Sequence, residues 1–445
     1  YTTLFRSLET GQYRIEGSVL IIEGEAISSV TWVSAGEGGE LEETVKNAFT
    51  LALGEGRAAN VSLGYLNGTL TTSGDKVYQI TNTGETKINL SGVYNSGATL
   101  PSGNLNYQGD IWMDINGGAF GIIAGGVTNE WSTNLQTSTL TGDTHVQLSG
   151  DATAEHVIGG NNKGASTTLT GNTNVTVKDN AIVAGAIIGG STSAHNAVTT
   201  ITGNTSVLVT NVQYSNTAQN LDGGLSNSYI IGGSSWSSNT TSETTIQGST
   251  SATINLNGIT LSGTEEHNSF VKTIIGGSYG NVNNAGTVNN INGDTSVSII
   301  GREGITFTGD IIGGSFENSG QAQYTIGGNS SISISGGSTF TGNIYGGSYS
   351  KVPGNTGSTM TTAGNITVEL GTGAYRGNIY GAGNKGTAGG DVLVSLTGGS
   401  VFGAEGEQSG ITIGGSAGAA VEGNRTLELK GTFGTGDFQN VTFTR

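Results

Sequence analysis

The chain has 445 residues, a formal net charge of -17 and no cysteine. Gly accounts for 79 residues, Pro for only 2, and charged residues make up 11% of the chain. These values exclude a collagen-like repeat and a disulfide-stapled domain, and the absence of basic clusters argues against a nucleic-acid partner. The sequence also lacks the run of about 20 apolar residues that a transmembrane segment requires.

Residues 1–108 are rich in Glu and carry only faint traces of the repeat that follows. Within them, Leu41–Leu53 places apolar residues such as Val45 and Phe49 at helical spacing, which predicts one helix. A solenoid leaves an open sheet edge at each end, and such an edge must be covered. We therefore expect residues 1–108 to form an irregular N-terminal cap that contains this helix, together with the first irregular coils.

Two short phrases recur, out of step with each other, over residues 109–430. The first is Ile-Ile-Gly-Gly-Ser, as at Ile274–Ser278, and it returns roughly every 36 residues, a period typical of solenoids. The second is Gly-(Asn/Asp)-x-x-apolar-x-apolar, as at Gly171–Val177. Clear copies of the second phrase begin at Gly109, Gly142, Gly171, Gly203, Gly293, Gly328, Gly364, Gly390 and Gly423.

Each repeat reads as three strands: a short strand, a longer strand after the Gly-Asn corner, and a third strand that ends in Ile-Ile-Gly-Gly. In the longer strand, Thr173, Val175 and Val177 alternate with polar residues and should face inward. This pattern predicts an all-β fold, a right-handed parallel β-helix (β-solenoid) of about ten or more coils. The corners should need positive φ, which Gly and Asn tolerate, and stacked Asn side chains should hydrogen-bond from coil to coil.

Residues 431–445 are strand-like and carry no recognisable cap, so we expect them to start a further coil. The chain opens on Tyr1 instead of an initiator Met. Both features suggest a processed segment whose natural chain continues beyond Arg445.

Catalytic, cofactor and metal sites are not indicated by the residue pattern. Asp and Glu are scattered, whereas glycan-cleaving enzymes need carboxylates at a fixed separation. Two Gly-x-Ser-x-Gly segments, Gly276–Gly280 and Gly414–Gly418, are copies of the repeat corner and no helix pattern follows them. The four His residues form no HExxH pair, and His145 is expected to be solvated at an outward strand position. We therefore expect a protein that is not an enzyme and binds no cofactor.

Two features are candidates for a recognition surface. Aromatic residues follow the Ser of the first phrase in four successive repeats, at Trp236, Tyr279, Phe316 and Tyr349. Their rings should form a stripe, either as a structural stack or as an exposed surface for a ligand. Two long connections, 210–229 and 255–273, leave consecutive coils at the same corner, so they form either a binding site or solvated loops. Their candidate contact residues are Tyr214, Glu265, Glu266, His267 and Phe270.

The two phrases, the absence of Cys and the abundance of Ser, Thr, Asn and Gly resemble the passenger domains of bacterial autotransporters (type V secretion) and related large β-helical surface adhesins. The resemblance covers residues 109–430. It implies an extracellular location at the surface of a Gram-negative bacterium and adhesion to host glycans, host surface proteins or neighbouring cells. Two alternatives stay open: a structural subunit that self-associates into a surface fibre or layer, and a carbohydrate-active enzyme on the same fold.

Overall fold

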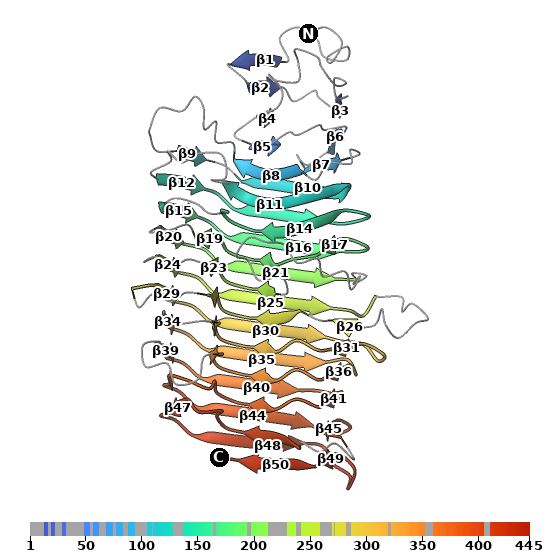
Figure 1. Ribbon diagram of the computed structural model, residues 1–445, viewed down its shortest axis with the longest axis vertical. Coiled ribbons are helices and arrows are strands. Elements are labelled where there is room, and N and C mark those ends of the chain that lie inside the picture. The colour runs from blue at the N-terminus through green and yellow to red at the C-terminus, as the bar shows by residue number, and fades with distance from the viewer. Residues whose placement is uncertain are drawn as a thin grey trace.

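The computed structural model is a tall stack of strands with the N-terminal strands at one end and the C-terminal strands at the other (Figure 1). From residue 110 onward it describes the chain except 128–136, 163–165, 194–196, 212–228, 237–241, 259–268, 271, 282–285, 319–321, 352–358 and 405–409. Before residue 110 it describes only the strands β1–β9. The secondary structure of these described residues is entirely β, without a helix.

Two large sheets run along the molecule, each taking one strand from every regular coil. The 13-stranded long sheet consists of β3 (Ser29–Trp32), β6 (Gly68–Ser73), β7 (Val77–Asn82), β10 (Ile111–Gly117), β13 (Thr144–Leu148), β16 (Thr173–Lys178), β21 (Thr205–Thr210), β25 (Thr250–Asn255), β30 (Thr295–Ile300), β35 (Ser330–Ser335), β40 (Ile366–Leu370), β44 (Val392–Thr397) and β48 (Arg425–Lys430). The 16-stranded Ile-Ile sheet consists of β1 (Tyr13–Glu16), β2 (Val19–Ile22), β4 (Phe49–Leu53), β5 (Arg57–Val61), β8 (Ile88–Val93), β11 (Ala119–Val127), β14 (Thr153–Ile158), β17 (Ile182–Val183), β18 (Ile187–Ile188), β22 (Tyr229–Ile231), β27 (Thr273–Ile275), β32 (Ile311–Ile312), β37 (Ile344–Tyr345), β42 (Ile379–Tyr380), β46 (Ile411–Gly414) and β50 (Val441–Thr444).

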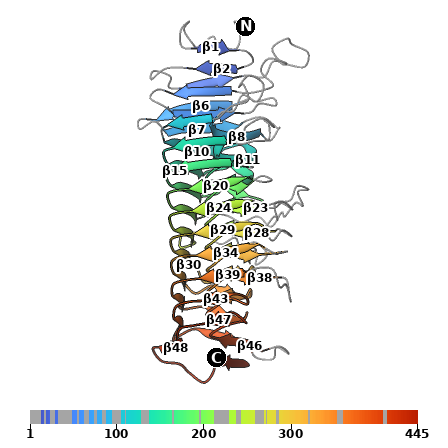
Figure 2. The same cartoon turned by 90° about the vertical axis from the view of Figure 1, so that its left-hand side faces the viewer.

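Three smaller sheets complete the coils. The 10-stranded Thr sheet, which faces the viewer in Figure 2, consists of β9 (Leu105–Gln108), β12 (Thr137–Thr141), β15 (Ser166–Thr170), β20 (Val198–Ile201), β24 (Glu243–Ile246), β29 (Val288–Ile291), β34 (Gln323–Ile326), β39 (Thr359–Thr362), β43 (Thr387–Ala388) and β47 (Ala420–Val421). The 5-stranded Ser corner sheet consists of β19 (Thr192–Ser193), β23 (Ser235–Trp236), β28 (Tyr279–Gly280), β33 (Phe316–Glu317) and β38 (Tyr349–Ser350). The 6-stranded aromatic corner sheet consists of β26 (Ser269–Phe270), β31 (Thr306–Phe307), β36 (Thr339–Phe340), β41 (Ala374–Tyr375), β45 (Val401–Gly403) and β49 (Phe438–Gln439).

The regular coils pair in parallel and in register, which confirms the predicted parallel β-helix. In the long sheet Val146 pairs with Val175, and Val175 pairs with Val207. Val175 and Val207 are each 1% exposed, so they stack in the core as the alternation predicts. The three main strands of each coil were expected, whereas the two-residue corner sheets are too short to leave a periodic signal.

The first strands of the chain pair differently from the regular coils. β1–β2, β3–β6, β6–β7, β4–β5 and β5–β8 are antiparallel pairs, and parallel pairing becomes regular where β10 joins β7 and β11 joins β8. The predicted helix is wrong in its last five residues, because Phe49–Leu53 forms strand β4. Residues 41–48 lie outside the described part of the chain. The β-branched and apolar run Phe49–Leu53 fits a strand as well as a helix face, and pairing on two sides, with β2 and β5, decides between them.

Residues 431–445 supply two strands, β49 and β50, of the coil that contains β48. β48 pairs with β44, β49 pairs with β45, and β50 pairs with β46. Leu427, Leu429 and Phe443 are 44%, 51% and 49% exposed at this end of the stack.

Close packing of backbones, and not positive φ, explains most of the corner glycines. Among those that open the two phrases in the described residues, only Gly142 and Gly171 have φ in the left-handed region. Gly276 does not, but a Cβ there would collide with the carbonyl oxygen of Gly313 on the next coil. The expectation of positive φ at Gly276 is therefore wrong, although the requirement for Gly stands for a different physical reason.

Side-chain amides and hydroxyls bind the coils together at these corners, as predicted for the Asn residues. Asn172 Oδ1 accepts from the backbone N–H of Asn204 at 2.9 Å, and each following coil repeats the bond as far as Asn424. Inside five of the described coils, an inward Thr or Ser of the long sheet donates to a corner carbonyl, as Thr173 does to Gly189 at 2.5 Å. The turns are thus held by side chains whose spacing is set by the repeat.

Candidate recognition surfaces

The aromatic stripe at the Ser corner is largely internal. Tyr279 and Phe316 are 1% and 5% exposed and pack, with ring centroids 5.5 Å apart, beside Ile275 and Ile312. Tyr349 is half-buried with its ring 5.7 Å from that of Phe316. An exposed stripe is therefore wrong for Tyr279 and Phe316, because their rings cover the outward isoleucines of the Ile-Ile sheet. The side chain of Trp236 lies outside the described part.

Among the candidate contact residues of the two long connections, the prediction for Phe270 is wrong. Phe270 is 2% exposed and belongs to the core. It opens a ladder of six stacked or tilted rings, with centroids 4.9 to 5.3 Å apart, of which the last is only partly buried: Phe270, Phe307, Phe340, Tyr375, Phe402 and Phe438. Tyr214, Glu265, Glu266 and His267 lie outside the described residues, so their role stays a prediction.

A different surface, on the outer face of the long sheet, brings together exposed aromatic and polar side chains of the kind found in binding sites. In β10 the residues Ile111, Met113 and Ile115 are buried, so Trp112 and Asp114 face outward. Register aligns Trp112 with His145 and Asp114 with Gln147. The rings of Trp112 and His145 stack at 3.7 Å with an interplanar angle of 11°, and 36% of Trp112 remains exposed.

Hydrogen bonds join the polar residues of this surface across the two coils. Gln147 Nε2 donates to Asp114 Oδ1 at 2.9 Å. At the corner, the backbone N–H of Asp143 donates to Asp110 Oδ1, also at 2.9 Å. We refer to these outward side chains together as the Trp112 surface, namely Asp110, Trp112, Asp114, Asp143, His145 and Gln147.

The Trp112 surface carries negative charge. Burial lowers the pKa of the His145 imidazole, although the charges of Asp143 and Asp110 act in the opposite direction. The imidazole is therefore mostly neutral at pH 7, and it does not offset the three carboxylates. His145 lies at the expected outward position but is only partly exposed, because the indole covers one face of its ring.

Sequence reasoning missed Trp112, although a signal was present. The alternation in Ile111–Ile115 puts a large aromatic residue at a position where later coils hold smaller residues, such as Asn174 and Ser206. An outward Trp between two Asp residues breaks the monotony of that face. Its neighbour His145 is distant in sequence, and only the register between β10 and β13 brings the two rings together.

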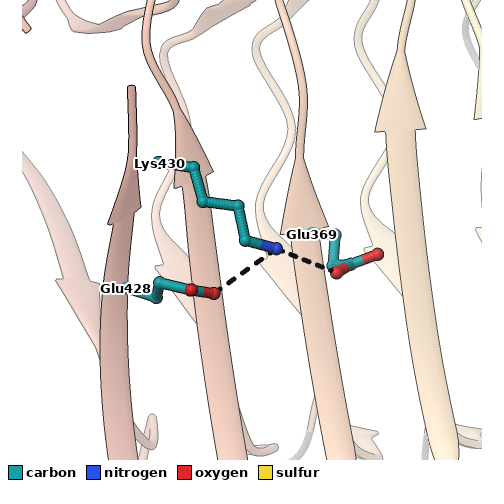
Figure 3. A network of polar contacts seen from close by, with 3 residues as sticks. All are labelled: Glu369, Glu428 and Lys430. Atoms are coloured by element: carbon teal, nitrogen blue, oxygen red, sulfur yellow. Dashed lines mark hydrogen bonds and ion pairs between the residues drawn. The ribbon is translucent and has the colours of Figure 1, made fainter. Parts of the chain in front are cut away.

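Ion pairs at the other end of the same face contribute little. Figure 3 shows Lys430 between Glu369 and Glu428, with each N–O distance at 3.4 Å. All three side chains are between 44% and 51% exposed. Pairs of this kind are screened by solvent and typically stabilise by less than about 1 kcal/mol.

Two buried ionisable groups lie away from the Trp112 surface. Tyr324 donates to the Glu317 carboxylate at 2.5 Å, and burial followed by the Glu317 charge raises the Tyr324 pKa well above its ordinary value. The Lys272 ammonium donates to the carbonyls of Ala184 and Gly185, two coils earlier. The Tyr324–Glu317 bond joins two successive strands of one coil, β33 and β34, whereas Lys272 reaches across two coils. All three side chains are interior, with 0–3% exposed.

Two features of the described structure bear on metal binding and on a serine nucleophile. Among the described residues, no three of His, Cys, Asp and Glu lie close enough to hold a metal ion. Ser278, the centre of one Gly-x-Ser-x-Gly segment, is 0% exposed and its hydroxyl accepts from the backbone N–H of Ser234 at 3.1 Å. Ser278 therefore forms hydrogen bonds that link neighbouring coils at the Ser corner.

No family model, no curated protein and no solved structure matches the chain. In the part of the chain that the structure describes, no helix is long and apolar enough to cross a membrane.

Proposed function

We propose that this protein is a surface-displayed adhesin, a rod that carries a recognition surface away from a bacterial cell and binds a partner there. Stacked coils suit this task, since most contacts are made between adjacent coils and the rod lengthens by adding repeats. Its surface of Ser, Thr, Asn and Gly with a net charge of -17 favours solubility over aggregation. The proposal agrees with the resemblance to autotransporter passengers.

The single observation that carries the proposal is the exposed indole of Trp112 stacked on His145 among outward carboxylates. Exposed aromatic residues with polar neighbours are typical anchors in binding sites, where a few residues supply most of the affinity. A purely structural rod does not require an exposed Trp at this place, because the equivalent position holds His145 in the next coil and Asn, Ser, Thr or Leu in the coils after it.

Binding arrays give the first test. The purified wild-type protein and the Trp112→Ala variant are applied to arrays of glycans and of extracellular proteins. We expect wild-type signals that the variant loses. Absence of any ligand for the wild type, together with filaments in electron micrographs, would favour the self-associating structural subunit, and release of reducing sugar ends would favour an enzyme.

Surface display is tested separately. Protease treatment of intact source bacteria should remove the protein, whereas a periplasmic marker should be spared. Protection of the protein from protease in intact cells would contradict the proposed location.

A further inference from the structure

The carboxylates of the Trp112 surface lie on both sides of the exposed indole. Asp110, Trp112 and Asp114 alternate along the chain, so all three face outward, about 7 Å apart from one to the next. The coil that follows adds Asp143 beside Asp110 and Gln147 beside Asp114. An aromatic ring thus sits in a negatively charged frame that spans two coils.

Among the described residues of the next three coils, the positions aligned with this surface carry no Lys or Arg; the outward Lys178 lies beyond them, at the end of β16. The outward positions aligned with Asp110, Trp112 and Asp114 in the next three coils hold Asp, His, Asn, Gln, Ser, Thr and Leu, and none of them holds Lys or Arg. His145 is neutral for the reason given above. The local field therefore attracts a cation and repels sulfated, phosphorylated or sialylated ligands.

We propose that the Trp112 surface docks an arginine side chain of a basic partner protein, with the guanidinium against the indole and between the carboxylates of Asp110 and Asp114. This inference rests on the proposed adhesive function and gives the partner its chemistry. A guanidinium suits this frame because it is planar, stacks on aromatic rings and forms paired bonds with carboxylates. Lysine offers the charge without the planar fork.

The test uses a fluorescein-labelled, acetylated hexa-arginine peptide as the probe and a hexa-citrulline peptide as its neutral isostere. Citrulline keeps the planar side chain and removes the charge. Binding is followed by fluorescence anisotropy with the full chain, at low and at high salt. We expect the arginine peptide to bind, to weaken as salt rises, and to bind more tightly than the citrulline peptide.

Matched charge variants separate the site from the general negative charge of the protein. The double variant Asp110→Asn/Asp114→Asn removes the frame, while Asn keeps the Oδ1 acceptors that Asp143 and Gln147 use. The control Asp294→Asn/Asp391→Asn removes two exposed corner carboxylates far from Trp112, where no aromatic residue lies alongside. We expect the Kd to rise about tenfold in the first variant and little in the control.

Ring variants test the indole itself. Trp112→Ala should weaken binding about tenfold, and Trp112→Phe, which keeps an aromatic ring over His145, by less. Leu208→Ala is the control, because Leu208 is 37% exposed on the same sheet face. Melting temperatures of all variants show whether the fold is intact, and Trp112→Phe keeps the test valid if the Ala variant is unstable.

The possible outcomes are distinct. Equal weakening in both charge variants, or equal affinity for the arginine and citrulline peptides, overturns the arginine site. If a neutral saccharide binds and Trp112→Ala abolishes that binding, the arginine site is wrong and the adhesive function stands. If neither peptides nor arrays give binding that depends on Trp112, both the arginine site and the recognition role of this surface fail.

Discussion

Asn204 accepts the backbone N–H of Ser249 on its Oδ1 at 2.8 Å while its own N–H donates to Asn172 Oδ1 at 2.9 Å. Each corner side chain in this ladder therefore satisfies a backbone donor of the next coil. An unpaired donor at a sharp turn would cost free energy, which is why Asn, Asp and Ser recur at this place.

The ladder predicts that Asn204→Ala lowers the free energy of unfolding by about 1 kcal/mol, because the N–H of Ser249 loses its acceptor. Asn204→Asp keeps an oxygen at the same position and should cost much less. Urea denaturation of both variants measures the difference. Equal destabilisation by Ala and Asp would mean that the acceptor is not what stabilises the corner.

Gly276→Ala is expected to destabilise the protein by about 1 to 3 kcal/mol, because the added Cβ meets the backbone carbonyl of Gly313, which cannot move without shifting a coil. Gly436 is the control, since a Cβ there has nothing within 4 Å. Thermal melting of Gly276→Ala and Gly436→Ala should separate them clearly. Comparable melting temperatures would contradict the close-approach explanation of the corner.

Burial of the rings at the Ser corner predicts that removing them lowers stability, whereas removal of an exposed stripe would leave stability almost unchanged. Replacing Tyr279 and Phe316 together by Ser should lower stability strongly, by about 3 kcal/mol or more, because both rings leave voids beside Ile275 and Ile312. Leu208→Ser, at an exposed position, should change the melting temperature little. A double variant as stable as the wild type would show that the rings are not part of the core.

Lys272 predicts a pH dependence. Burial lowers the pKa of its ammonium to about 7 from the ordinary value of 10.5, so between these pH values the unfolded chain binds more protons than the folded one. Stability therefore rises with pH in this window, by about 2 kcal/mol from pH 7 to pH 9 relative to a Lys272→Met variant. Urea denaturation of both proteins at the two pH values measures the difference. If wild type and variant differed in free energy of unfolding by the same amount at both pH values, a buried, partly neutral amine would be contradicted.

The main fold was predictable because its signal repeats. Three features recur in most coils: the alternation seen around Val175, the Gly-Asn corner seen at Asn172 and the phrase seen at Ile274–Ser278. Because they recur, irregularities in single coils do not hide the pattern. The cap region has no such redundancy. Phe49–Leu53 fits a helix face locally, and pairing with strands elsewhere in the chain makes it a strand.

The proposed recognition surface was harder to predict than the coils. Tyr279 and Phe316 recur at one corner, but the sequence does not reveal that their rings turn onto the outward isoleucines instead of solvent. An outward Trp at this strand position occurs in one coil only, and its partner His145 is placed beside it only by the register of two strands. A unique residue carries no periodic signal, so a binding site on a solenoid is visible only after the coils are aligned.

Attachment of protein-coated beads to cell layers tests the adhesive function most directly. Fluorescent beads carry equal amounts of the wild type, Trp112→Ala or Leu208→Ala, and the beads that remain after washing under flow are counted. The account predicts that wild-type and Leu208→Ala beads attach and that Trp112→Ala beads are lost. Equal retention of the Trp112→Ala beads, with an unchanged melting temperature, would contradict it.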